Sequence, residues 1–271
     1  MPAPVVTFLS DYGLGDEFVG VVHGVIARAA PAARVIDLTH GIRRHDVVAG
    51  ALALRAALPF TPPGVHLAIV DPGVGGERRA AAVRCAEEDR ILVGPDNGLL
   101  ALALARFGGG IEAAEISRSP WRLEPVAATF HGRDVFAPVA ARLAAGAPLA
   151  EAGDPLDPDE LVALDIPAPR LEAGAIGATV LAVDRFGNAI LNVGHEHLAG
   201  SGLRLGRAAT LVVAGQAVPA QYARTFADVP AGTPLVYEDA ARTLAVAVNR
   251  GSAADDLGLA PGSELRIEPE A

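Results

Sequence analysis

The sequence has a single cysteine, and it lacks long apolar runs and a signal peptide. Cys85 alone cannot form an intramolecular disulfide or a cysteine-rich metal site, so we interpret it as a small core residue in a strand. No window holds the roughly 18 successive apolar residues that a membrane-spanning helix requires. The N-terminus also lacks the basic region and the cleavage pattern of a signal peptide. We therefore expect a cytoplasmic protein with no membrane partner.

Aromatic and basic residues are also scarce. Aromatic residues make up 4% of the chain, and the formal net charge at pH 7 is −10. The basic clusters are short, namely the pairs Arg43-Arg44 and Arg78-Arg79. This balance argues against nucleic acid as a partner and is compatible with a cationic small molecule. The apolar fraction of 51%, supplied largely by alanine and valine, is ample for a core of helices packed closely on sheets.

The N-terminal half alternates apolar strands with helical periodicity, which predicts a mostly parallel sheet covered by helices on both faces. This pattern is typical of an α/β/α domain. The predicted elements are strands over 4–10, 33–38 and 65–71, helices over 17–29 and 46–57, strands over 79–85 and 89–96, and helices over 98–107 and up to Gly146.

The composition changes after Gly146. A Pro-, Ala- and Asp-rich stretch from about residue 147 predicts a linker at the end of an N-terminal domain over 1–165. Over residues 173–271, helical periodicity fades, and short β-like runs such as 210–218 are separated by turns. We therefore predict a second, smaller antiparallel β domain that is barrel-like.

Asp71 ends an apolar strand and is followed by three glycines and by Arg78 and Arg79. The spacing of these glycines does not fit a dinucleotide-binding fingerprint, so we interpret them as turn-forming residues. An acid at the end of a buried strand must find hydrogen-bond donors or stay neutral. A structural ion pair with arginine and a catalytic carboxylate are both consistent with this spacing.

Three other polar residues are expected at the same edge of the sheet. Asp11 follows the first strand, where it could cap a helix or accept hydrogen bonds from the two hydroxyls of a ribose. Asn97 could form an Asx turn or contact a ligand. His131 precedes a helix and is either a hydrogen-bonded structural group or a catalyst. The histidines interpreted as structural or surface residues are His23, His40, His45 and His66.

Six motifs occur in order along nearly the whole chain: 8–13, 70–75, 94–99, 129–138, 184–188 and 247–251. Together they resemble the S-adenosylmethionine hydroxide adenosyltransferase family, the relatives of the fluorinase and chlorinase. The resemblance implies an N-terminal α/β domain, a C-terminal β domain and a homotrimer. It places the ligand between the N-terminal domain of one subunit and the C-terminal domain of its neighbour.

The resemblance also implies a reaction, in which water or hydroxide attacks C5′ of S-adenosylmethionine to give adenosine and methionine. It assigns the catalytic set to Asp71, Arg78 and His131, with Arg79 as the alternative arginine. Because the sulfonium of the substrate is already a good leaving group, we expect that the reaction requires neither metal nor cofactor. The residues assigned to substrate binding are Asp11 for the ribose hydroxyls, Asn97, Asp184, Phe186, Asn188, Tyr237 and Asn249.

Two departures from the family pattern bear on function. The halogenating relatives carry a serine where this chain has Gly132, which favours the hydroxide reaction over a halogenase. Ala240 and Ala241 stand where family members often carry serine, which puts one methionine contact in question. A metal-dependent nucleotide hydrolase is a further alternative, although no acid and histidine pair has compact metal-binding spacing. A non-catalytic protein that binds adenosine or S-adenosylmethionine is the last.

Overall fold

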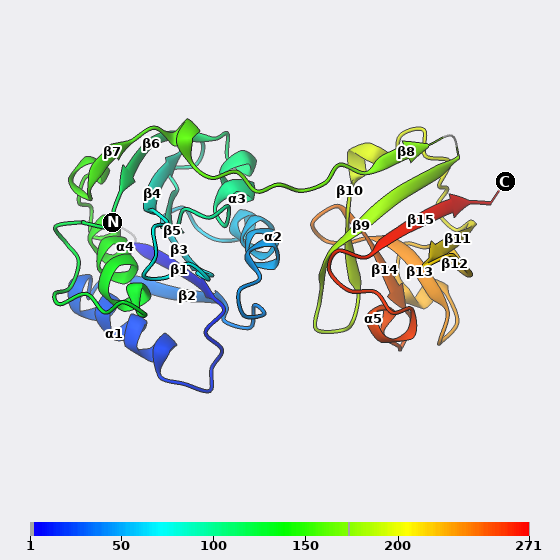
Figure 1. Cartoon of the computed structure of the whole chain (residues 1–271), viewed down its shortest axis with the longest axis horizontal. Coiled ribbons are helices and arrows are strands. Elements are labelled where there is room, and N and C mark those ends of the chain that lie inside the picture. The colour runs from blue at the N-terminus through cyan, green and yellow to red at the C-terminus, as the bar shows by residue number, and fades with distance from the viewer. Residues whose placement is uncertain (1–2, 173, 271) are drawn as a thin grey trace. The chain divides into compact units, whose positions relative to one another are not determined.

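The computed structural model describes residues 3–172 and 174–270. The chain folds into two compact units, with the boundary between Asp165 and Ile166 (Figure 1). The predicted start of the second domain, residue 173, lies outside the described residues, as do the chain ends 1 and 271. Of the helices in the described ranges, none has the length and apolar character needed to span a membrane.

The N-terminal unit contains a mixed sheet, with seven strands among the described residues in the order β2-β1-β3-β5-β4-β6-β7. The β1–β2, β1–β3 and β3–β5 pairs are parallel, and β4 and β7 run against their neighbours. The strands are β1 (Val5–Ser10), β2 (Arg34–Thr39), β3 (Val65–Ile69), β4 (Ala80–Cys85), β5 (Ile91–Pro95), β6 (Gly110–Glu115) and β7 (Asp154–Leu156).

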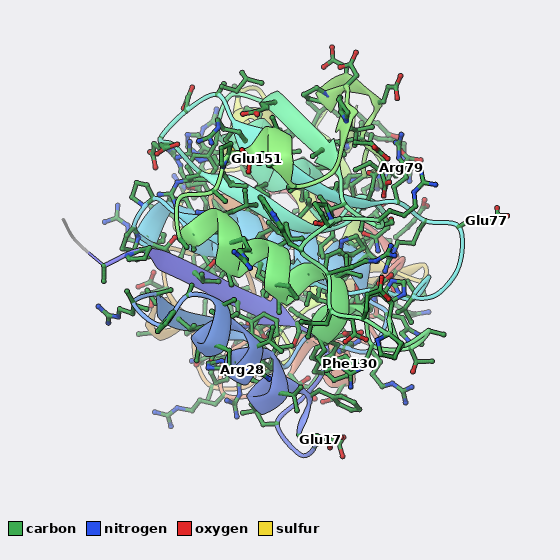
Figure 2. The ribbon with its side chains drawn as sticks, turned by 90° about the vertical axis from the view of Figure 1, so that its left-hand side faces the viewer. Glu17, Arg28, Glu77, Arg79, Phe130 and Glu151 are labelled. Carbon is green, nitrogen blue, oxygen red and sulfur yellow. The ribbon has the colours of Figure 1, made fainter. Side chains whose placement is uncertain are left out.

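Helices cover both faces of this sheet, which confirms the predicted α/β class. The helices α1 (Phe18–Ala29) and α4 (Ala137–Ala144) pack on the face turned toward the viewer in Figure 2. The helices α2 (Val47–Ala57) and α3 (Ala101–Arg106) pack on the other. Successive side chains of a strand point to opposite faces, so Phe8 joins the first core and Leu9 the second.

Strand β6 was not among the predicted elements, and the reason is visible in its sequence. It reads Gly-Ile-Glu-Ala-Ala-Glu, in which small and acidic residues obscure the strand pattern. Its partner β7 falls in the stretch predicted as a linker. Pro155 is tolerated there because β7 is an edge strand, where an unavailable N–H does not interrupt a ladder. The first part of the predicted linker is therefore packed into the N-terminal unit.

The C-terminal unit is a closed barrel of seven strands among the described residues, because β10 pairs with both β9 and β14. The β12–β13 pair is parallel, whereas the other pairs are antiparallel as predicted. The elements are β8 (Arg170–Glu172), β9 (Ala175–Val183), β10 (Ala189–Gly194), β11 (Ala208–Val213), β12 (Gln216–Tyr222), β13 (Pro234–Glu238), β14 (Thr243–Val248), α5 (Ala253–Asp256) and β15 (Glu264–Pro269).

One predicted run in this unit is two strands. The stretch 210–218 turns back at Ala214 and Gly215, which have positive φ angles of 48° and 80°. Consecutive residues of positive φ form the tight turns that match the twist of a hairpin. The remaining described elements are a π-helical turn and five 3₁₀ turns. The π-helical turn is Gly132–Phe136, and the 3₁₀ turns are Leu58–Phe60, Leu149–Glu151, Pro158–Glu160, His195–Leu198 and Phe226–Asp228.

Candidate active site

Asp71, Arg78 and His131 meet in the N-terminal unit. The Arg78 guanidinium forms a bidentate ion pair with the Asp71 carboxylate. Nε donates to Oδ1 over 2.9 Å, and Nη2 donates to Oδ2. The same Nη2 lies 3.0 Å from Nδ1 of His131. The side chain of Asp71 is 6% exposed and that of Arg78 is 11% exposed. The three residues thus form a sheltered group at the carboxyl end of β3.

The loop after β3 reaches His131 because of one glycine. Gly75 has a φ of +75°, which an L side chain rarely adopts, and a Cβ there would overlap the carbonyl oxygen of Ala128. Glycine therefore allows the loop to lie directly against the segment that leads to His131. Glu77 of this loop projects outward (Figure 2), whereas the next residue, Arg78, turns inward to Asp71.

His131 stands immediately before a turn of π-helix, Gly132–Phe136. The carboxylate of Asp134 holds this region in place by accepting from the Ala127 N–H over 2.8 Å. Burial lowers the pKa of His131 below its ordinary value of 6.5, and the positive charge of Arg78 adds to this, against the opposite effect of Asp71 and Asp134. The imidazole is therefore neutral at pH 7, with its Nδ1 accepting from Arg78.

Tyr12 also belongs to this group, although its place in the sequence predicted no role for it. Burial raises its pKa above the ordinary value of 10.0, and the charges of Asp11 and Asp71 add to the effect. The phenol is therefore protonated at neutral pH. A Cβ at position 132 would overlap the Tyr12 hydroxyl, so the glycine makes room for the tyrosine. The available signal was adjacency, because Tyr12 directly follows Asp11.

Replacing Gly132 with alanine is expected to lower the unfolding free energy by about 1–3 kcal/mol, because the methyl group overlaps the Tyr12 hydroxyl. Adding Tyr12→Phe should recover most of the loss, since the next tyrosine atom, Cζ, lies 3.2 Å from that position. Urea denaturation of the two single variants, the double variant and the parent protein measures the coupling. Strictly additive effects would show that the two residues do not meet.

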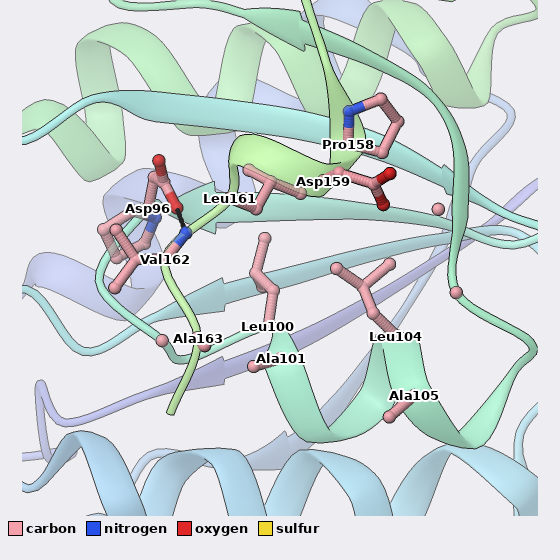
Figure 3. Close-up of a pocket in the computed structure, with 14 residues that line it drawn as sticks. Asp96, Leu100, Ala101, Leu104, Ala105, Pro158, Asp159, Leu161, Val162 and Ala163 are labelled. Carbon is pink, nitrogen blue, oxygen red and sulfur yellow. Dashed lines mark hydrogen bonds between the residues drawn. The ribbon is translucent and has the colours of Figure 1, made fainter. Parts of the chain in front are cut away.

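Arg79 faces a different carboxylate from Arg78. Its Nε donates to Oδ2 of Asp96 over 2.8 Å, and its side chain is 36% exposed. The other oxygen of Asp96 accepts from the Val162 N–H over 2.7 Å (Figure 3). Of the two arginines left open by the sequence, Arg78 is thus the one that joins Asp71 and His131.

Asp96 also borders a cavity of about 290 Å³, lined largely by apolar residues of α3 and of 158–163 (Figure 3). Leu100, Leu104 and Leu161 contribute to its wall. Asp71, Arg78 and His131 do not line this cavity. We therefore do not assign the chemistry of the site to it.

Asp11 and Asn97 lie at the carboxyl ends of β1 and β5. Oδ2 of Asp11 accepts from the His45 N–H over 3.0 Å, which holds the loop before α2. Asn97 binds backbone on both sides: Nδ2 donates to the Val70 carbonyl over 2.9 Å, and Oδ1 accepts from the Leu99 N–H over 3.2 Å. Asn97 therefore forms an Asx turn that ties β3 to β5, and its contact with a ligand stays a prediction.

The predicted binding residues of the C-terminal unit gather mainly on two adjoining loops. In the β9–β10 loop, Oδ1 of Asp184 accepts from the backbone of Phe186 and of Asn188, and Oδ2 accepts from the Asn188 side chain. Phe186 itself is 71% exposed. This loop meets the segment after β14, because the Ala254 N–H donates to the Gly187 carbonyl.

Asn249 and Tyr237 have structural partners within the same unit. Nδ2 of Asn249 donates to the Val229 carbonyl over 2.7 Å. Tyr237 packs against Phe226, and burial raises the pKa of its hydroxyl to about 12, with smaller contributions from Asp184 and another acid. Tyr237 is therefore a protonated, half-buried donor near Asp184.

The fold and the site together describe a two-domain protein, with a mixed α/β unit that carries an Asp–Arg–His group and a closed β barrel after it. The chain matches the sequence profile of the SAM hydroxide adenosyltransferase N-terminal domain over residues 6–153. It matches that of the C-terminal domain of the same family over residues 178–266. The chain therefore belongs to the SAM hydroxide adenosyltransferase family.

Individual relatives cover nearly the whole chain. The chain is 51% identical to an (R)-S-adenosyl-L-methionine hydrolase of Salinispora tropica, over 98% of both sequences. It is 30% identical to a fluorinase of an Actinoplanes species, over 98% of this chain and 99% of the relative. The crystal structure of an uncharacterized conserved protein from Thermotoga maritima superimposes with a TM-score of 0.89 at 36% identity. That alignment covers 97% of this chain and 99% of the other.

Proposed function

We propose that this chain hydrolyses S-adenosyl-L-methionine by attack of water on C5′, giving adenosine and L-methionine. The observation that carries the proposal is the contact of Arg78 with both Asp71 and His131. It occurs in a chain 51% identical to a protein named (R)-S-adenosyl-L-methionine hydrolase. The chain is also 30% identical to a fluorinase, which supports the same type of displacement. This identity is lower than that to the hydrolase, so hydrolysis is the proposal.

The substrate already contains a good leaving group. The positively charged sulfonium departs as the neutral thioether of methionine, so its departure needs no general acid and no covalent intermediate. The difficult part is the nucleophile. Forming free hydroxide at pH 7 from water of pKa about 15.7 spans about nine pK units, or about 12 kcal/mol.

The positive charge of Arg78 cannot stabilise a free hydroxide by that much, because the Asp71 carboxylate already neutralises it. We therefore propose that a positioned water loses its proton as it attacks, rather than before. Arg78 orients the water oxygen. The Asp71 carboxylate and the neutral His131 are the two candidate acceptors of the proton. The Asp71 oxygens keep free lone pairs beside their bonds to Arg78, whereas Nδ1 of His131 accepts from Arg78 and can take the proton only once that contact opens.

The acid limb of the pH profile should report His131. Since its neutral form is the competent one and its pKa is lowered, kcat/KM should stay level near pH 6.5 and fall only at more acidic pH. The profile of kcat/KM over about pH 5 to 8 measures this, because it reflects the groups of the free enzyme. An acid midpoint at or above 6.5 would contradict a neutral His131 whose pKa is lowered by burial and by Arg78.

Substrate binding is proposed to use residues of both units. Asp11 would accept from the ribose hydroxyls, while Asn97, Asp184, Phe186, Asn188, Tyr237 and Asn249 would contact the remainder of the substrate. We further propose a cytoplasmic homotrimer without cofactor, in which each site lies between two subunits, on the basis of the family resemblance. Light scattering coupled to gel filtration measures the assembly, and a monomeric mass in an active preparation would refute it.

The reaction is tested by incubating the purified protein with S-adenosyl-L-methionine and separating the products. Equimolar adenosine and methionine support hydrolysis. Added chloride or fluoride tests the halogenase alternative, which predicts 5′-halo-adenosine. Intact ligand recovered after tight binding would instead indicate a binding protein. If a chelator abolishes hydrolysis and added metal restores it, the protein is a metal-dependent hydrolase.

A further inference from the structure

A second group of titratable side chains lies outside the Asp71–Arg78–His131 group and shares no residue with it. His23 comes from α1, Asp37 from β2 and His40 from the residue after β2. Nε2 of His23 lies 2.8 Å, and Nε2 of His40 lies 3.1 Å, from the same oxygen, Oδ1 of Asp37. Potential ligand atoms of all three residues lie within 4.8 Å of one another. Two imidazole nitrogens thus converge on one carboxylate.

His40 is the unusual member because it is buried. Its side chain is 3% exposed, and the direction of its Nε2 gives no hydrogen bond to any described residue, although Asp37 is near. Its other ring nitrogen, Nδ1, lies 2.8 Å from the hydroxyl of Ser10, which fixes the ring. A buried polar nitrogen without a hydrogen bond is costly, so it needs a physical explanation.

We propose that His23, Asp37 and His40 bind one divalent transition-metal ion that favours imidazole ligands. Zinc is the ion we expect, with water completing its coordination. A zinc ion would supply the partner that Nε2 of His40 lacks and would be bound by two imidazoles and one carboxylate oxygen, all common zinc ligands. The Ser10 hydroxyl would then hold the ligating ring at its second nitrogen, an arrangement typical of metal-bound histidines.

The two distances to Asp37 are close to what such an ion needs. Ligand bonds to zinc are about 2.0–2.2 Å long, so tetrahedral ligand atoms lie about 3.3–3.5 Å apart. Distances of 2.8 and 3.1 Å therefore have to open by only a few tenths of an ångström. His23 and Asp37 can supply that movement because their side chains are 36% and 43% exposed, while His40 stays anchored.

The ion would tie together the end of β2, helix α1 and the segment that carries Asp11. Besides its contact with Ser10, His40 accepts from the Gly13 N–H through its backbone carbonyl over 2.8 Å. We assign the ion this structural role, separate from the chemistry at Asp71. The sequence spacing could not reveal the site, because Asp37 and His40 are three residues apart at the end of a strand and His23 comes from a helix.

The test is a zinc titration of chelator-stripped full-length protein in competition with a chromophoric chelator. One zinc ion per chain is expected. His23→Gln removes a part-exposed ligand and should weaken zinc binding by about tenfold or more. The matched control is His195→Gln, which removes an exposed histidine paired with Glu238 in the other unit and should leave the affinity unchanged.

A second readout does not depend on zinc affinity alone. Cobalt bound at this site should give visible absorption bands typical of nitrogen and oxygen coordination, and these bands should disappear in Asp37→Asn and His23→Gln but persist in His195→Gln. Less than half an equivalent of bound zinc would overturn the proposal. Undiminished zinc affinity in His23→Gln would overturn it as well, because the ion would then be held elsewhere.

Discussion

Replacing Asp71 with asparagine is expected to reduce turnover of S-adenosyl-L-methionine by about 10²–10⁴-fold, the range typical of a lost proton-transfer group. The amide keeps the shape of the carboxylate but carries no charge to hold Arg78, which donates to both oxygens of Asp71. Arg78 would then lose the partner that fixes its distance to His131. Release of adenosine under substrate saturation gives kcat, and calorimetric titration gives the affinity of the free enzyme.

The expected signature is a fall in kcat with a small change in binding. Such a split identifies a group that acts mainly in the transition state. Circular dichroism and the urea midpoint serve as controls for folding. An Asp71→Asn protein with parental kcat would remove Asp71 from the mechanism and leave it as the structural half of an ion pair.

The second large effect is expected when each of two adjacent arginines is replaced with lysine and the two variants are compared. Arg78→Lys should lower kcat/KM by at least about 10²-fold, because one ammonium cannot reproduce the fork that reaches Asp71 with two nitrogens and His131 with one. Arg79→Lys should retain activity within a few-fold, since Arg79 pairs with Asp96 and is part-exposed. Steady-state kinetics of the two variants, purified in parallel, measures the contrast.

The two variants form a matched pair, because the same substitution is made at two adjacent positions of one loop. Equal losses in the two proteins would mean that the loop as a whole is sensitive, and a larger loss in Arg79→Lys would reverse the assignment. Both outcomes contradict the geometry in which Arg78 alone joins Asp71 to His131.

Much of the N-terminal unit could be predicted from the sequence, because the helices and strands are cleanly periodic and both faces of the sheet are buried. The strand that leads to Asp71 and the helix from residue 47 are examples. Strand β6 was missed because Gly110, Glu112 and two alanines carry little β signal, and its strand character comes from pairing with β4. Tertiary pairing of this kind cannot be read from local residue preferences.

The candidate site was predictable as a set of residues but not as a geometry. The sequence favoured Arg78 and left Arg79 as the alternative, and the structure separates them by their partners, since Arg78 donates to Asp71 and Arg79 donates to Asp96. Tyr12 was missed for a related reason, since its contact with Gly132 joins residues far apart in the chain. Close approach between distant segments depends on backbone positions that a one-dimensional pattern does not contain.

Attack of water on C5′ is tested most directly by the source of the oxygen in the product. The protein should be incubated with S-adenosyl-L-methionine in water enriched in the heavy oxygen isotope, and the adenosine and methionine analysed by mass spectrometry. We expect one heavy oxygen in adenosine, located at the 5′-hydroxyl, and none newly incorporated into methionine. Adenosine without the label, or a product other than adenosine and methionine, would contradict this reaction.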